Sequence, residues 1–201
     1  MRTRSILAVS VMVALAALSA RAGFTMSGDK PPKSEAPASS SPSLPAGGQE
    51  QASGTRQDAE RKYALAYDEI AKAKKDLDAG KARNAEKKFQ RALERLRDAV
   101  TLDSTYHEAW NLVGYTSRKL GDYDRAFAAY EKCLSIKSDY APAREYLGEA
   151  RLEKNDPAGA HEQLAMLEKL NPGSDESKAL RAALNAYEVA HGTAAADSAA
   201  H

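Results

Sequence analysis

Apolar and small residues recur along the middle of the chain at alternating steps of three and four positions. In the segment 107–119, four of them fall on one side of a helix: Trp110, Val113, Gly114 and Ser117. After a turn over 121–124, a second segment has the same spacing, with Ala126, Tyr130, Cys133 and Leu134. The pattern predicts two antiparallel helices that are joined by a tight turn and packed through these faces.

The pattern of residues 107–140 recurs thirty-four positions later, over 141–174. Three residues of the first copy and their counterparts in the second are Trp110 and Arg144, Gly114 and Gly148, and Ala126 and Ala160. A fixed period of this length indicates a repeat architecture. The glycine and the alanine of each copy are small where the two helices would approach most closely, because a larger side chain there would force the helices apart. We therefore predict that these residues, with Trp110, pack within the repeats.

A longer helix pair precedes these two copies. Its first helix is predicted from near Thr55 to about Gly80, with a stripe formed by Tyr63, Tyr67, Ile70, Lys74 and Leu77. Its second helix, over 82–102, carries seven apolar residues: Ala85, Phe89, Ala92, Leu93, Leu96, Ala99 and Val100. Aligning this stripe with the next copy requires seven extra residues, which are nearly two helical turns, so the same face continues inward. The pair is therefore predicted to join the stack as a repeat over about 66–106.

A last helix is predicted over 175–190, after the breaker at 171–173. Its apolar stripe consists of Leu180, Ala183, Leu184 and Tyr187. A stack of repeats cannot bury its open end by itself, so a capping helix is expected there. The tail over 192–201 is expected to be flexible.

The spacing of Trp110, Val113, Gly114 and Ser117 resembles the tetratricopeptide repeat. The signature of that family is Trp-x2-Leu-Gly-x2-Tyr, followed by a small alanine, an aromatic residue and a final proline. Here Ala126 and Tyr130 match the next two landmarks, and Pro172 ends the second copy. The resemblance implies an all-α solenoid over 55–191, with about three helix pairs and a capping helix. It also implies that the first helix of each pair lines a concave groove, which holds a partner's peptide or helix.

The resemblance places eight residues in this groove: Tyr67, Lys74, Asn111, Tyr115, Arg118, Lys119, Glu145 and Glu149. With Glu153, the last two would make one wall acidic, while the lysines and Arg118 would make the other basic. We expect Tyr115, with its neighbours on the same helix, to contact the partner; the alternative is that Tyr115 packs under a neighbouring helix.

One subgroup of the family clamps the C-terminal carboxylate of a chaperone with Lys, Asn and Arg. The matching positions here hold Ile70, Lys74, Leu112, Pro142 and Tyr146. Because this clamp is absent, chaperone-tail binding is not expected.

The N-terminus has the pattern of an export signal. Arg2 and Arg4 precede an uncharged apolar run over 6–18, and an Ala-x-Ala cleavage site ends at Ala22. The run is too short to span a bilayer, so no stable membrane insertion is expected after cleavage. Residues 23–54, rich in Pro, Ser, Ala and Gly, are expected to form a disordered linker. These features predict an exported protein, periplasmic or secreted.

Composition and motifs exclude several classes of function. The chain is 43% hydrophobic and 28% charged, and its formal charge of +1 does not suggest nucleic-acid binding. Removal of residues 1–22 would leave 26 basic against 28 acidic side chains. Cys133 is the single cysteine, which excludes an intramolecular disulfide, and its place on the inner helix face favours burial. No histidine spacing suits a metal, and no phosphate-binding loop or nucleophile elbow is present.

These observations predict a protein without catalytic activity, cofactor or metal. The predicted function is a protein–protein interaction module, an adaptor or scaffold in the periplasm or cell envelope that binds a protein or peptide partner. The alternative is a self-assembling structural protein, a homo-oligomer that uses the long second helix of the first pair.

Overall fold

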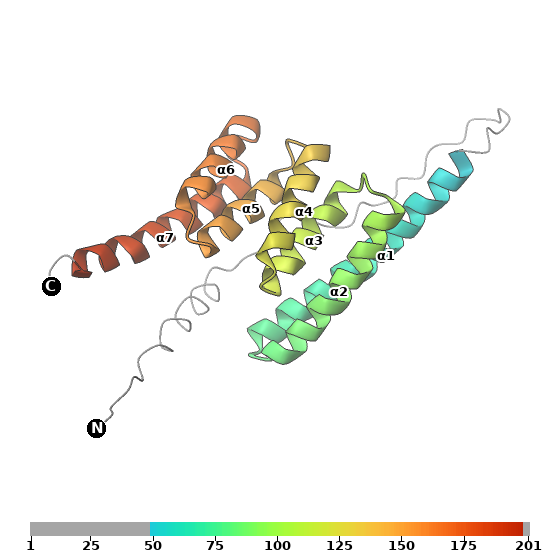
Figure 1. Ribbon diagram of the computed structural model, residues 1–201, viewed down its shortest axis with the longest axis horizontal. Coiled ribbons are helices and arrows are strands. Elements are labelled where there is room, and N and C mark those ends of the chain that lie inside the picture. Colours follow the sequence, from blue (N-terminus) through green and yellow to red (C-terminus); the bar gives the residue numbers. More distant parts are fainter. Residues whose placement is uncertain (1–48, 199–201) are drawn as a thin grey trace, which may run out of the picture. The chain divides into compact units, whose positions relative to one another are not determined.

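The computed structural model describes residues 49–198, with side chains over 55–192, and these residues belong to one compact unit. Within them, all regular elements are helices (Figure 1): α1 (Gln49–Asp78), α2 (Ala82–Leu102), α3 (His107–Lys119), α4 (Tyr123–Ile136), α5 (Ala141–Glu153), α6 (Pro157–Leu170) and α7 (Asp175–Ser198). The predicted signal peptide, most of the linker and residues 199–201 lie outside the described residues.

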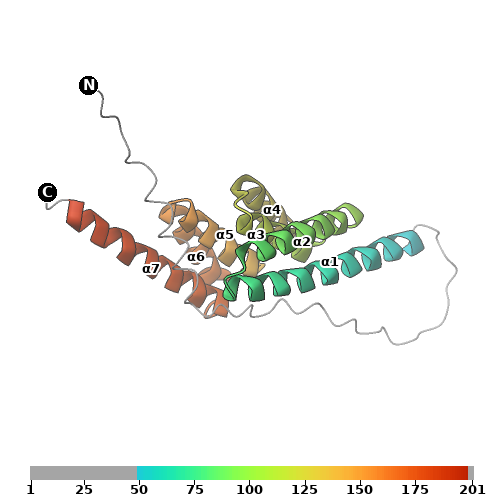
Figure 2. The ribbon, with the colours of Figure 1, turned by 90° about the horizontal axis from the view of Figure 1, so that it is seen from below.

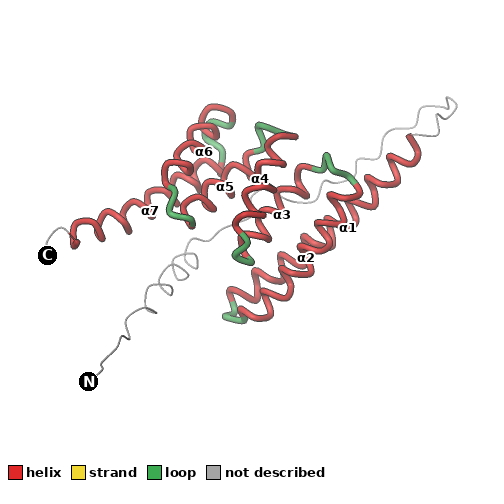
Figure 3. Tube along the Cα trace, viewed as in Figure 1, coloured by secondary structure: helices red, strands yellow, loops and turns green. Residues whose placement is uncertain are grey.

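The helices pack as three successive antiparallel pairs, followed by α7 (Figure 3). The pairs are α1 with α2, α3 with α4, and α5 with α6, and α7 packs on both α5 and α6. In Figures 1 and 2, α1 and α2 lie side by side as a long hairpin. Contacts of α2 with α3 and of α4 with α5 join neighbouring pairs. The predicted all-α architecture of three pairs and a capping helix is confirmed.

The long helix α2 follows the sequence pattern closely. It spans the predicted residues, and its buried residues are the seven apolar ones of the predicted stripe. Helix α1 departs from the prediction, because it begins at Gln49, within the expected linker. Its buried stripe is Ala59, Tyr63, Ala66, Ile70 and Ala73. Small alanines in this stripe let α1 approach α2 closely. Leu77, at the end of the predicted stripe, is 44% exposed.

The turns inside the second and third pairs are built in the same way. Gly121 and its counterpart Asn155 adopt positive φ values of 81° and 60°, a conformation that glycine and asparagine accept most readily. The next residue in each turn caps the following helix. Asp122 accepts a hydrogen bond from the backbone N–H of Arg125 at 3.1 Å, and Asp156 accepts one from Gly159 at 2.9 Å. The repeat is therefore as regular in its turns as in its helices.

The repeat also preserves a contact whose side chains differ. The indole N–H of Trp110 donates to the backbone carbonyl of Ser104 at 2.9 Å, which fastens the loop before α3. In the next copy, the guanidinium of Arg144 donates to the carbonyl of Ser138 at 3.1 and 2.6 Å. Arg144 therefore makes the same contact as Trp110, so the two copies share this structure although their sequence identity is low.

The predicted packing glycines both lie at close approaches. A Cβ added to Gly114 would be 2.5 Å from the ring of Tyr130 on α4. One added to Gly148 would be 2.6 Å from Leu180, on α7 rather than on the paired helix α6. Ala126 and Ala160 are fully buried, as the predicted packing requires.

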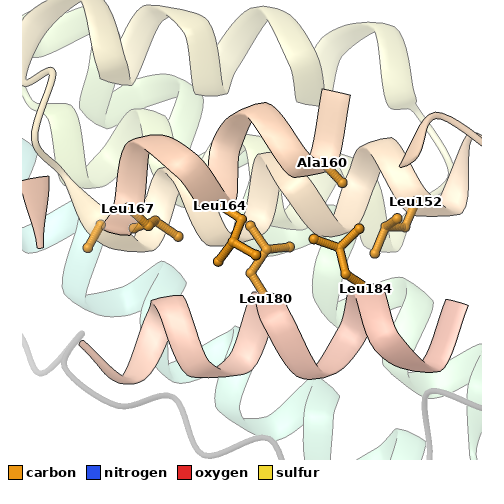
Figure 4. Packing of buried hydrophobic residues seen from close by; sticks show 7 residues of the cluster. Leu152, Ala160, Leu164, Leu167, Leu180 and Leu184 are labelled. Atoms are coloured by element: carbon orange, nitrogen blue, oxygen red, sulfur yellow. The ribbon is translucent and has the colours of Figure 1, made fainter. Parts of the chain in front are cut away.

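The capping helix α7 covers the end of the stack. Leu180 and Leu184 enter a cluster with residues of α5 and α6 (Figure 4): Leu152, Ala160, Leu164 and Leu167. The helix continues to Ser198, beyond the predicted end at residue 190, so the first part of the expected flexible tail is helical. This segment is rich in alanine, which has the highest helix propensity.

We expect Gly114→Leu to lower the free energy of unfolding by roughly 1 to 3 kcal/mol, because the new side chain would collide with the Tyr130 ring. Urea denaturation followed by circular dichroism measures this change. Gly192→Leu is the matched control, since nothing lies within 4 Å of an added Cβ there. Equal midpoints for the two variants would show that α3 and α4 are not packed as described.

Candidate functional site

Helix α3 lies at the centre of the predicted site and is buried on nearly all sides. It packs on α4 within its pair, and it also contacts α1, α2 and α5. Its buried residues are Ala109 and every residue from Asn111 to Arg118. Three of the four predicted groove residues of α3, Asn111, Tyr115 and Arg118, therefore lie between helices, where no partner reaches them without moving a helix.

Tyr115 illustrates this burial. Its side chain is only 2% exposed, with its ring centroid 5.3 Å from that of Tyr146 and 6.4 Å from that of Phe89. Burial raises the pKa of its hydroxyl to about 12. The expectation that Tyr115 projects toward a partner is wrong, and the alternative of packing under neighbouring helices is what the structure shows. The reason is that α2 and α5 both supply aromatic rings at this point.

Asn111 and Glu145 are buried as well. Asn111 is fully enclosed, and neither polar atom of its side chain has a hydrogen-bond partner among the described residues. Glu145, on α5, is 5% exposed. The expectation that these two residues line an open groove is therefore also wrong, because both side chains are enclosed.

Arg118 joins the two predicted walls of the groove. Its side chain is 2% exposed, and its Nη1 lies 2.7 Å from the carboxylate of Glu149 and 3.5 Å from that of Glu153. Its guanidinium carbon lies 5.8 Å from the ring centroids of both Tyr115 and Tyr146. Burial lowers the pKa of Arg118, but the combined attraction of Glu149, Tyr130 and Glu153 outweighs it, and the pKa is raised. The basic and acidic residues thus neutralise one another across the α3–α5 contact.

Besides Glu149, three predicted groove residues keep partial exposure. Tyr67 and Lys74 on α1 are half-buried, and burial lowers the pKa of Lys74. Lys119, at the end of α3, is half-buried with its Nζ 5.6 Å from the Tyr115 ring centroid. Burial, and then the positive charge of Arg118, lower the pKa of Lys119 to about 8. In the described part of the chain, no carboxylate lies within ion-pairing distance of this amine.

A cavity of about 350 Å³ lies where the α1–α2 turn meets the end of α3. Its lining residues are Leu77, Ala82, Arg83, Glu86, Phe89, Lys119 and Leu120. We call it the hairpin cavity. Only Lys119 among them was predicted as a site residue, because the others come from segments that the sequence pattern does not bring together.

The described residues offer neither a metal site nor a membrane-spanning helix. They contain no group of three or more His, Cys, Asp or Glu side chains placed to hold a metal ion. Among them, no helix combines the length and apolar character needed to cross a membrane. Cys133 is fully buried on α4, as its position in the sequence predicts.

We expect Glu149→Ala to lower the free energy of unfolding by roughly 3 kcal/mol, because it leaves the buried guanidinium of Arg118 without its nearest carboxylate. Glu168→Ala is the matched control, since its ion pair with Arg181 is exposed and should contribute about 0 to 1 kcal/mol. Denaturant unfolding of both variants measures the difference. A loss at Glu149 no larger than the loss at Glu168 would contradict a structural role for the buried pair.

Comparisons with known proteins agree with this architecture. Residues 118–184 match the family model of the tetratricopeptide repeat. The crystal structure of the Yersinia enterocolitica type III secretion chaperone SycD, in complex with a peptide of the translocator YopD, matches with a TM-score of 0.51 and 19% identity. That match covers 66% of this chain and 93% of the chaperone.

A crystal structure of MamA matches with a TM-score of 0.39 and 18% identity, over 63% of this chain and 95% of that one. No significant sequence match to a curated protein was found. Residues 118–184 of this chain therefore match the tetratricopeptide repeat, and the described residues have a helical-repeat fold of that type.

Proposed function

We propose that this protein is a non-catalytic interaction module, an adaptor or scaffold that binds a protein or peptide partner in the periplasm or cell envelope. The observation that carries the proposal is the stack of tetratricopeptide-type helix pairs. A solved structure with a related fold, the chaperone SycD, contains a bound peptide of its translocator. The expected export signal, at residues 1–22, motivates the location.

The partner-binding surface in this proposal is smaller than the one expected from the sequence. Tyr115, Asn111 and Arg118 are buried between the helices, so they support this surface from below and do not form part of it. Four of the predicted residues on the first helices keep partial exposure and form this surface in the proposal: Tyr67, Lys74, Lys119 and Glu149. Cations and a carboxylate occur together there, so association should weaken as the salt concentration rises.

One observation favours self-assembly as a second candidate. Helix α2 has 21 residues, whereas the second helices of the following pairs, α4 and α6, have 14 each. The first hairpin is therefore longer than the pairs it stacks on, and its outer face is open to another copy. Mixed charges along this face suit a polar interface between copies.

The two candidates predict different results for the purified full chain. An adaptor should be monomeric by size-exclusion chromatography with light scattering, and it should capture a defined partner from an envelope extract of its source organism. Capture should be retained by Gly192→Leu and lost with Gly114→Leu, which disrupts the repeat. A stable oligomer that captures nothing would contradict the adaptor function and support self-assembly.

A further inference from the structure

The hairpin cavity has an apolar wall that is partly exposed. Leu77, Phe89 and Leu120 come from three different helices or helix ends and meet around it. Phe89 is buried and packs edge-on against Tyr115, so this wall is rigid. Leu77 is 44% exposed. A volume of about 350 Å³ lies within the range of ligand pockets and accommodates an apolar side chain.

The charged residues at the cavity give it a preference for anions. Arg83 and Lys119 line it, and in the part of the chain that the structure describes neither forms an ion pair. The carboxylates nearest to Lys119 along α5, Glu149 and Glu153, both contact Arg118. One acidic residue, Glu86, also lines the cavity, and its carboxylate accepts a hydrogen bond from Gln90 at 3.4 Å. Two unpaired cations therefore face a single carboxylate.

The burial of Lys119 strengthens this preference. Its pKa is lowered because burial and the nearby Arg118 both disfavour the ammonium form. Lys74, on α1, is a second cation that acts on it, while Glu149 and Glu153 act in the opposite sense. A carboxylate placed in the cavity would lower the free-energy cost of keeping Lys119 in its ammonium form. An added cation would raise that cost.

We propose that the hairpin cavity is a docking site for a partner segment in which an apolar side chain adjoins an aspartate or glutamate. The apolar side chain packs among Leu77, Phe89 and Leu120, and the carboxylate pairs with Arg83 and Lys119. This inference rests on the proposed interaction function and specifies the chemistry of the partner. The cavity lies at the tip of the first hairpin and shares only Lys119 with the first-helix groove that the resemblance implies.

A selection from a library of random dodecapeptides, with the immobilised full chain as bait, tests the inference. Selected peptides should be enriched in Asp or Glu next to Leu, Ile or Phe. Fluorescence anisotropy then gives the Kd of each peptide for the chain and its variants. We expect Arg83→Gln with Lys119→Met to weaken binding about tenfold, since two ion pairs at a partly exposed site are lost. Leu77→Ser, at an exposed position, should weaken it by a similar factor.

The control carries the same charge changes away from the cavity: Arg97→Gln with Lys132→Met. These side chains are exposed and do not line the cavity, so binding should stay within about twofold. Peptides that bind all variants equally, or that lack acidic residues, would overturn the inference and leave the adaptor function standing. Failure to select any peptide would overturn it as well. Self-association lost in Leu77→Ser would assign the cavity to a second copy and also overturn it.

Discussion

The buried ion pair between Arg118 and Glu149 is the contact on which the arrangement of the central helices depends. A charge removed from water is costly unless a partner of opposite charge accompanies it, and here the partner comes from the next helix pair, 2.7 Å away. Aromatic rings of Tyr115 and Tyr146 surround the guanidinium. Separation of α3 from α5 would break the pair, so the second and third repeats are held in one arrangement.

Several buried polar groups at the centre have no hydrogen bond within the described part of the chain, so close packing has to offset their cost. Tyr106, Asn111, Thr116, Ser117 and Tyr130 all have buried polar side-chain atoms with no partner among the described residues. Such groups reduce stability. Close contacts of Gly114 with Tyr130 and of Phe89 with Tyr115 act in the opposite direction. The hairpin cavity, at the end of α3, lies beside this tightly packed region, so its wall is rigid.

Local features were predictable from the sequence, whereas features that depend on neighbouring pairs were not. The spacing along α2 predicted its buried face, and the pattern of the central repeat predicted the turn at Gly121. The burial of Tyr115 depends on two residues of neighbouring pairs. Phe89 belongs to the long first hairpin, and Tyr146 belongs to the next repeat. No spacing along a single helix reveals such contacts. The hairpin cavity was missed for the same reason, and the predictions of export and linker fall mostly outside the described residues.

Native-state hydrogen exchange of the full chain tests the central claim most directly, because it reports the stability of each helix separately. If α3 is held by its buried contacts with α2, α4 and α5, the amides from Leu112 to Arg118 should exchange only through global unfolding. They should then have the same free energy of opening as the amides of α5. Exchange of the α3 amides through local opening, at a free energy well below that of α5, would contradict the account.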